Sequence, residues 1–223
     1  MASCGEGPSA PRGTWPTGGN KERARRRLRR LEKAAFQPDA DFELWYGDGT
    51  RFDLLPVVRH MWRRRGKRLL LPTPGKNVKV AICGAYCFPD GPFLFSHDDS
   101  GSVNTALFLA LLSQLAARSK RTGKRVVLVL DNGGAFTSKR STRELEKVKA
   151  WVSVFWLPKY TSETLNRIEG VWGHLKDAFF SRMLTKEREA FYPAAVHLLR
   201  RLRRRRALRT ALRSTPRRTP AKT

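Results

Sequence analysis

Residues 125–132 have the sequence Arg-Val-Val-Leu-Val-Leu-Asp-Asn, an unbroken apolar run that stops at a carboxylate. Strands that are buried on both faces carry continuous Val and Leu runs, whereas half-exposed strands alternate between apolar and polar residues. We therefore expect Asp131 at the C-terminal end of a central strand, where open α/β sheets place their ligands. Taken alone, an Asp at this position is more often an ordinary turn residue after a core strand, because Gly133 and Gly134 follow it.

The composition points to a polyanionic partner. The chain of 223 residues carries 45 Lys and Arg against 19 Asp and Glu, for a formal net charge of +26. A field of that sign favours nucleic acid. An anionic membrane surface is the weaker alternative, because the basic segments carry few large apolar anchors. The sequence shows no signal peptide and no apolar span, so we predict a cytoplasmic protein without a membrane partner, associated with the nucleoid if the source is bacterial.

Patterning divides the chain into three parts. Residues 1–40 are predicted to be a disordered and basic N-terminal segment, because Gly, Pro and Ser come first and a run rich in Arg follows. In that run, Leu28, Leu31 and Phe36 fit one face of a short helix, and a solvated charge run that folds only on a partner fits equally well. Residues 41–183 are predicted to be the globular domain, and residues 184–223 a basic helix and tail.

The globular part is predicted to have the element order β-β-β-α-β-α-β-α. The strands are expected near residues 42–48, 78–88, 92–96, 125–130 and 152–157, and the helices near 105–118, 138–150 and 167–182, with a last helix over 186–212. The first three strands are joined as hairpins, and the last two are reached through helices. This order predicts an α/β fold with a mixed five-stranded sheet that starts antiparallel and ends parallel.

Three carboxylates stand out in this arrangement. Asp48 is predicted to end the first strand and Asp131 the fourth, so both would emerge at one place if these strands are neighbours. Glu169 borders the apolar stripe of the predicted helix that contains Trp172. A capping box, with Asn166 as the N-cap and Glu169 three residues later, explains that acid equally well.

Three blocks of the chain together resemble the bacterial insertion-sequence transposases of the mariner superfamily, over roughly residues 41–182. The first block is Trp-Tyr-Gly-Asp-Gly-Thr-Arg-Phe at 45–52, the second Val-Leu-Val-Leu-Asp-Asn at 127–132, and the third Leu-Asn-Arg-Ile-Glu-Gly-Val-Trp at 165–172. The resemblance implies a ribonuclease-H-like fold and a DDE endonuclease that cuts and joins DNA. It also implies that Asp48, Asp131 and Glu169 are the catalytic residues and the ligands of magnesium.

Metal chemistry suits such residues. Crowded carboxylates repel one another, which raises the pKa of at least one of them. Hard divalent ions with oxygen ligands relieve the repulsion, and two Mg2+ ions, or Mn2+ as a substitute, can serve in-line displacement at phosphorus.

Four departures from the family pattern leave other functions open. Gly49 stands where the family usually has Glu, Phe136 where it has His, and Arg167 where it has Pro, and the loop at 161–164 is one residue longer. A catalytically weakened or inactive nucleic-acid-binding remnant is therefore the main alternative. A different nuclease of the same fold, such as a resolvase or an RNA–DNA hybrid hydrolase, is a third.

DNA is the expected partner, as transposon ends and as target duplex. We predict that a basic cluster and one lysine on the Glu169 face contact phosphates, although a solvated basic face is the usual alternative. These residues are Arg63, Arg64, Arg65, Lys67, Arg68 and Lys176. We also expect a homodimer in the active state. Only about forty residues precede the first predicted strand, fewer than paired helix-turn-helix modules need, so a separate N-terminal helix-turn-helix polypeptide is expected to read the ends.

Overall fold

The computed structural model describes residues 21–54, 77–89, 91–178 and 188–202. Its centre is a five-stranded sheet in the order β3-β2-β1-β4-β5. The strands are β1 (Phe42–Asp53), β2 (Lys79–Cys87), β3 (Phe93–Asp98), β4 (Arg125–Leu130) and β5 (Val152–Trp156). The pairs β1–β2 and β2–β3 are antiparallel, whereas β1–β4 and β4–β5 are parallel. The mixed sheet expected from the sequence is thus confirmed.

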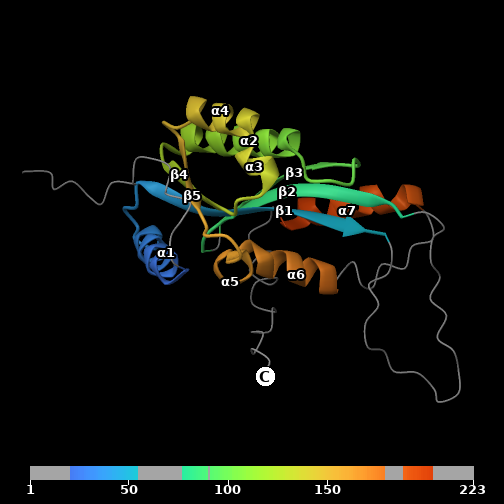
Figure 1. The fold of residues 1–223 in the computed structure, drawn as a ribbon, viewed down its shortest axis with the longest axis horizontal. Helices are drawn as coiled ribbons and strands as arrows, with labels where there is room; N and C mark the ends of the chain where they lie inside the picture. The colour runs from blue at the N-terminus through green and yellow to red at the C-terminus, as the bar shows by residue number, and fades with distance from the viewer. Residues whose placement is uncertain (1–20, 55–76, 90, 179–187, 203–223) are drawn as a thin grey trace, which may run out of the picture.

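One face of the sheet is covered by α2 (Thr105–Thr122), α3 (Gly134–Thr137) and α4 (Lys139–Lys147), as Figure 1 shows. Helix α2 starts where the side chain of Asn104 accepts a hydrogen bond from the Leu107 amide at 3.0 Å. It ends at Gly123, whose φ of 69° is the left-handed conformation that favours glycine at a helix end. These helices pack on Trp45, Leu128 and Leu130 of the sheet.

The other face carries α1 (Lys21–Ala35), α5 (Ser162–Leu165), α6 (Ile168–Ala178) and α7 (Arg188–Leu202). Alternate residues of the central strands point to this side, among them Tyr46 of β1 and Val129 of β4. Both sheet faces are therefore buried under helices, which explains why the strand sequences are nearly continuous in apolar residues. In the described part of the chain, no helix combines the length and the apolar character needed to cross a bilayer.

The structure bears on two expectations, the end of the first strand and the conformation of the basic N-terminal run. The prediction that Asp48 ends the first strand is wrong, because β1 continues to Asp53 and pairs there with Lys79 of β2. The basic run at residues 21–35 forms a helix, with Ala24 and Leu28 buried in the core. Of the two alternatives for this run, the structure therefore supports the helix.

Candidate active site

Asp48 and Asp131 lie side by side because of the strand register. The parallel pairing of β1 with β4 ends at Tyr46 opposite Val129, and Asp48 and Asp131 are each two residues further along. Both positions continue the strand face of Tyr46 and Val129, which is the face covered by α6. Asp48 therefore lies where β4 stops, although β1 itself runs on beside β2.

The side chain of Asp48 is held in place by α6. Its Oδ2 accepts a hydrogen bond from the indole Nε1 of Trp172 at 3.1 Å, and the residue is only 9% exposed. Gly84 of β2 lies directly opposite Asp48, and a Cβ at that position would be 2.8 Å from the Trp172 ring. The absence of a side chain at Gly84 thus gives Trp172 the room to reach the carboxylate. The sequence pattern had placed Trp172 only in the apolar stripe of a helix.

Charge is crowded around Asp48. Burial raises the pKa of Asp48 to about 7, with further contributions from the negative charges of Glu169 and Asp131. Burial also raises the pKa of Glu169, and Asp131 and Glu163 add to this effect while the nearby Lys176 opposes it. The three carboxylates of the predicted triad therefore share one electrostatic neighbourhood.

A divalent cation fits the chemistry of these donors, because hard ions prefer carboxylate oxygens and would relieve the repulsion that raises the pKa of Asp48. The carboxylates do not surround a common point as they stand. Among the described residues, no group of three or more His, Cys, Asp or Glu side chains is arranged so that it could hold a metal ion. A bound ion would thus have to draw the candidate ligands together.

Asn166 ties the start of α6 to β1. Its Nδ2 donates to the carbonyl oxygen of Gly47, the residue before Asp48, at 2.9 Å, while its Oδ1 is buried and accepts no hydrogen bond. The amide of Glu169 donates instead to the backbone carbonyl of Asn166 at 3.2 Å. The capping-box explanation for Glu169 is therefore wrong, since it requires the Asn166 side chain to accept that bond. The side chain is used for a contact between elements distant in the sequence.

The segment after β4 is held in a similar way. The Asp131 Oδ1 accepts the amide of Gly133 at 3.0 Å, which forms a local turn. Asn132 donates from Nδ2 to the carbonyl oxygen of Leu157 at 2.6 Å and so links the ends of β4 and β5. Asp131 is thus both a turn residue and part of the acidic neighbourhood, so the two interpretations of its role are compatible.

Two departures from the family pattern are explained by packing on the α2 side of the sheet. A Cβ at Gly49 would lie 2.5 Å from Cγ1 of Val103, so the space of a larger residue is already occupied. Phe136 is buried and packs edge-to-face on Phe108 with ring centroids 5.1 Å apart. Neither departure removes a carboxylate from the candidate site.

Of the residues predicted to contact DNA, the structure describes Lys176. Arg63, Arg64, Arg65, Lys67 and Arg68 lie outside the described residues. Lys176 lies seven residues after Glu169 on α6, and its charge acts to lower the pKa of that glutamate.

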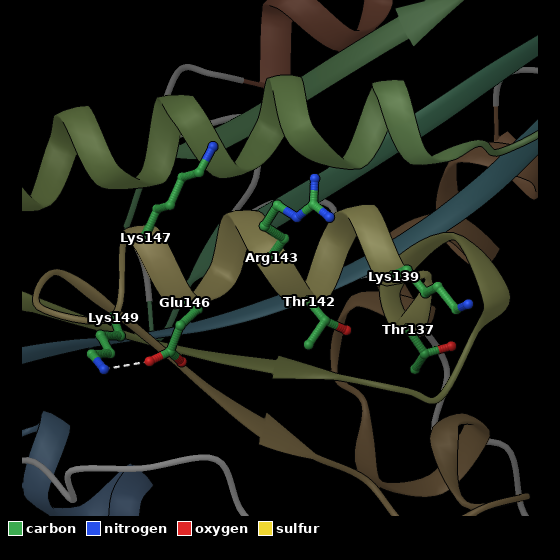
Figure 2. A pocket seen from close by; sticks show the side chains of 7 residues that line it. All are labelled: Thr137, Lys139, Thr142, Arg143, Glu146, Lys147 and Lys149. Atoms are coloured by element: carbon green, nitrogen blue, oxygen red, sulfur yellow. Dashed lines mark hydrogen bonds and ion pairs between the residues drawn. The ribbon is translucent and has the colours of Figure 1, made fainter.

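A surface hollow lies elsewhere, on α3, α4 and the segment that follows. It is lined by Thr137, Lys139, Thr142, Arg143, Glu146, Lys147 and Lys149. Figure 2 shows these side chains spread from the end of α3, along α4, to the segment after it, with Lys149 paired to Glu146. Because α4 packs on the sheet face opposite α6 and none of the three carboxylates lines the hollow, it is separate from the candidate active site.

Comparison with known proteins supports the family resemblance. The model of the DDE superfamily endonucleases matches residues 43–191. The insertion element IS630 uncharacterized 39 kDa protein of Shigella sonnei is 31% identical over 147 residues, which make up 66% of this chain and 41% of that protein. The chain therefore spans less than half of the length of this curated relative.

The fold is similar to that of Mos1 mariner transposase. The paired-end complex with Mn aligns with a TM-score of 0.59 at 15% identity, over 95% of this chain and 64% of that chain. The isolated Mos1 catalytic domain aligns with a TM-score of 0.52 at 13% identity, over 83% and 85% of the two chains. The expected ribonuclease-H-like fold is thus confirmed.

Proposed function

Because this chain belongs to the DDE superfamily endonucleases, we propose that it cuts and joins DNA strands in transposition, with Asp48, Asp131 and Glu169 as its catalytic triad. One observation carries the proposal. Asp48 and Asp131 each follow the last β1–β4 pair by two residues, and the pKa of Asp48 is raised by burial and by the charges of Glu169 and Asp131. Such crowding of buried acids is unfavourable for folding and is typical of sites that serve chemistry.

The three carboxylates would hold Mg2+, or Mn2+ as a substitute, as two ions. Bound there, the ions would supply activation of the attacking oxygen and stabilisation of the leaving oxygen at phosphorus. Support comes from the all-carboxylate donor set and from solved complexes of Mos1 that contain Mg or Mn.

The chain's own residues position these ligands. Trp172 donates a hydrogen bond to one oxygen of Asp48 and so fixes the orientation of this carboxylate. Asn166 fixes the first turn of α6 relative to β1 and so sets the place of Glu169. Lys176 favours the ionised form of Glu169, which is the form that binds a cation.

The test is a nicking assay on duplex DNA with and without Mg2+. Asp131→Ala should abolish cleavage, because it removes a ligand, and should leave DNA binding intact or tighter. Glu163→Gln is the matched control, since Glu163 is an exposed carboxylate near Glu169 that lies outside the triad. This variant should retain cleavage.

The products separate the competing functions. Strands joined to a second duplex support transposition, whereas cleavage without joining supports a nuclease of another type. A folded chain that binds DNA but never cleaves it, with Mg2+ or Mn2+, would refute the enzymatic proposal and favour the remnant. Equal cleavage by wild type and Asp131→Ala would refute the triad.

For the assembled transposase we propose a homodimer acting on two transposon ends and a target duplex, in the cytoplasm and, if the source is bacterial, beside the nucleoid. Support comes from a second Mos1 structure of similar fold, which is a paired-end complex with the left transposon end. We further propose that specific recognition of the ends depends on a separate helix-turn-helix polypeptide, because phosphate contacts from basic residues do not read sequence. Footprinting of the ends by this chain alone would contradict that division.

A further inference from the structure

Helix α1 is strongly basic and lies on the same side of the sheet as α5 and α6 (Figure 1). Few of its residues are buried on the inner face. Ala24 and Leu28 lie in the core, and Leu31 is partly buried against it. Every exposed residue of this helix is a cation. These are Lys21, Arg23, Arg26, Arg29, Arg30 and Lys33.

Both acids of α1 are already paired. Glu22 pairs with Arg25 of the same helix at 3.0 Å, and Glu32 pairs with Arg167 at the start of α6. Arg26 also pairs with Glu22, at 3.7 Å, so only two acids stand against the eight Lys and Arg residues of this helix, and its exposed face keeps a strong positive charge. Like charges at helical spacing repel, so a polyanion bound along this face would stabilise it.

A network around Glu32 fixes α1 close to the candidate active site. Glu32 accepts hydrogen bonds from the hydroxyl of Tyr46 at 2.5 Å and from Arg167 at 2.8 Å. The Arg167 guanidinium also lies 5.0 Å from the ring centroid of Phe88. Burial acts against the charge of Glu32, yet the bonds from Arg167 and Tyr46 leave its pKa below the ordinary value, so Glu32 holds both partners as a carboxylate.

The two residues that donate hydrogen bonds to Glu32 lie on the segments that carry the candidate catalytic carboxylates. Tyr46 is two residues before Asp48 on β1, and Arg167 is two residues before Glu169. The last turn of α1, which contains Glu32, is therefore joined to both segments. Arg167 is also where the chain departs from the proline usual in the family, so this ion pair depends on that departure.

We propose that α1 binds the DNA backbone, and that the Glu32–Arg167 ion pair holds its basic face beside the candidate active site. The occupant is the phosphate backbone of the duplex on which the site acts, so the inference rests on the proposed function. Charge complementarity favours DNA, because exposed cations spaced along one helix face suit a regular row of phosphates.

The first test measures the salt dependence of binding to a 30-base-pair duplex in EDTA. One variant replaces three exposed cations in the last turns of α1 with Gln: Arg29, Arg30 and Lys33. The matched control removes the same charge from exposed positions on the opposite sheet face: Arg121, Arg140 and Arg143. Each phosphate contact contributes about 0.9 to the slope of log K against log salt, so the α1 variant should lose up to about 2.7 in slope.

The control variant should lose much less slope. Equal losses in the two variants would mean that only net charge matters, and would overturn the proposal, as would an unchanged slope in the α1 variant. This assay needs neither metal nor cleavage. A chain that fails to cut DNA can therefore still pass or fail it, which separates this inference from the proposed function.

The second test addresses the ion pair. Glu32→Lys makes the protein more positive, so charge alone predicts tighter DNA binding, whereas release of α1 predicts weaker binding. Adding Arg167→Glu restores the net charge and permits the reversed ion pair, so the double variant should recover binding. Tighter binding by the single variant, or no recovery in the double variant, would refute the role of the pair. If Glu32→Lys does not fold in a melting experiment, the three-residue variant of α1 still decides the proposal.

Discussion

Replacing Asp48 with Asn should stabilise the metal-free protein at high pH. The pKa of Asp48 rises from the ordinary value of 3.8 to about 7 in the folded chain, through burial and then through Glu169 and Asp131. The folded protein therefore binds this proton more tightly than the unfolded chain does. Folding is favoured by the protonated acid at low pH, and that advantage is lost as the pH rises from 3.8 through 7. Because Asn does not titrate, the variant does not lose this stability as the pH rises.

The expected size follows from the two pKa values. At about 1.36 kcal/mol for each pH unit between them, Asp48 lowers the free energy of unfolding, relative to its value at low pH, by about 1.6 kcal/mol at pH 5 and by about 4 kcal/mol above pH 7. The free energy of unfolding of Asp48→Asn, relative to wild type, should thus rise by roughly 3 kcal/mol between pH 5 and pH 8. Any fixed cost of burying the new amide group is the same at both pH values and cancels.

Urea denaturation in EDTA at several pH values, followed by circular dichroism, measures this difference. Asp53→Asn is the control, because Asp53 lies on the same strand but pairs with Arg51 and Asn77 instead of other acids. Adding Mg2+ should stabilise the wild type more than Asp48→Asn, since binding to the folded state raises its stability. A relative stability of Asp48→Asn that does not change with pH would refute the raised pKa of Asp48.

Three further substitutions test the packing that supports the site. Leu28→Ala should lower the free energy of unfolding by about 2–4 kcal/mol, because it removes a buried contact of α1; a loss below about 1 kcal/mol in urea would show that α1 is not docked. Arg118→Ala should lower the free energy of unfolding by roughly 3 kcal/mol, because Glu43 loses the two hydrogen bonds that Arg118 donates to it at 2.7 and 2.6 Å. Glu43→Ala in the same chain should recover part of this loss. Gly49→Ala should lower Tm because its Cβ would lie 2.5 Å from Val103 Cγ1; adding Val103→Ala should restore most of the loss, and additive losses would contradict this explanation.

Much of the fold was predictable because its signals are local. The apolar run before Asp131 showed a strand buried on both faces, and the structure places it as β4 in the middle of the parallel half of the sheet. The antiparallel start followed from the expected hairpins, and the family followed from three motifs in order. Asn104 and Gly123 set the two ends of α2 through interactions with residues a few positions away, and such interactions can be recognised in a sequence.

The details of the site depended on partners far apart in the chain. The sequence pattern suggested that the first strand stops at Asp48, but β1 continues because β2 supplies hydrogen bonds as far as Asp53. Periodicity placed Trp172 on an apolar face, and only the packing of α6 on β1 shows that its indole also reaches Asp48.

The N-terminal helix shows the same division most clearly. Its charge pattern left a docked helix and a solvated run equally acceptable, because the repulsion among its cations is local while the compensating contacts are not. Glu32 meets Arg167 across 135 positions of sequence, and Leu28 is buried only because the sheet is present. Local sequence determines which conformations a segment favours. The free energy that selects among them comes from burial and ion pairing with distant elements, and these exist only once the chain has folded.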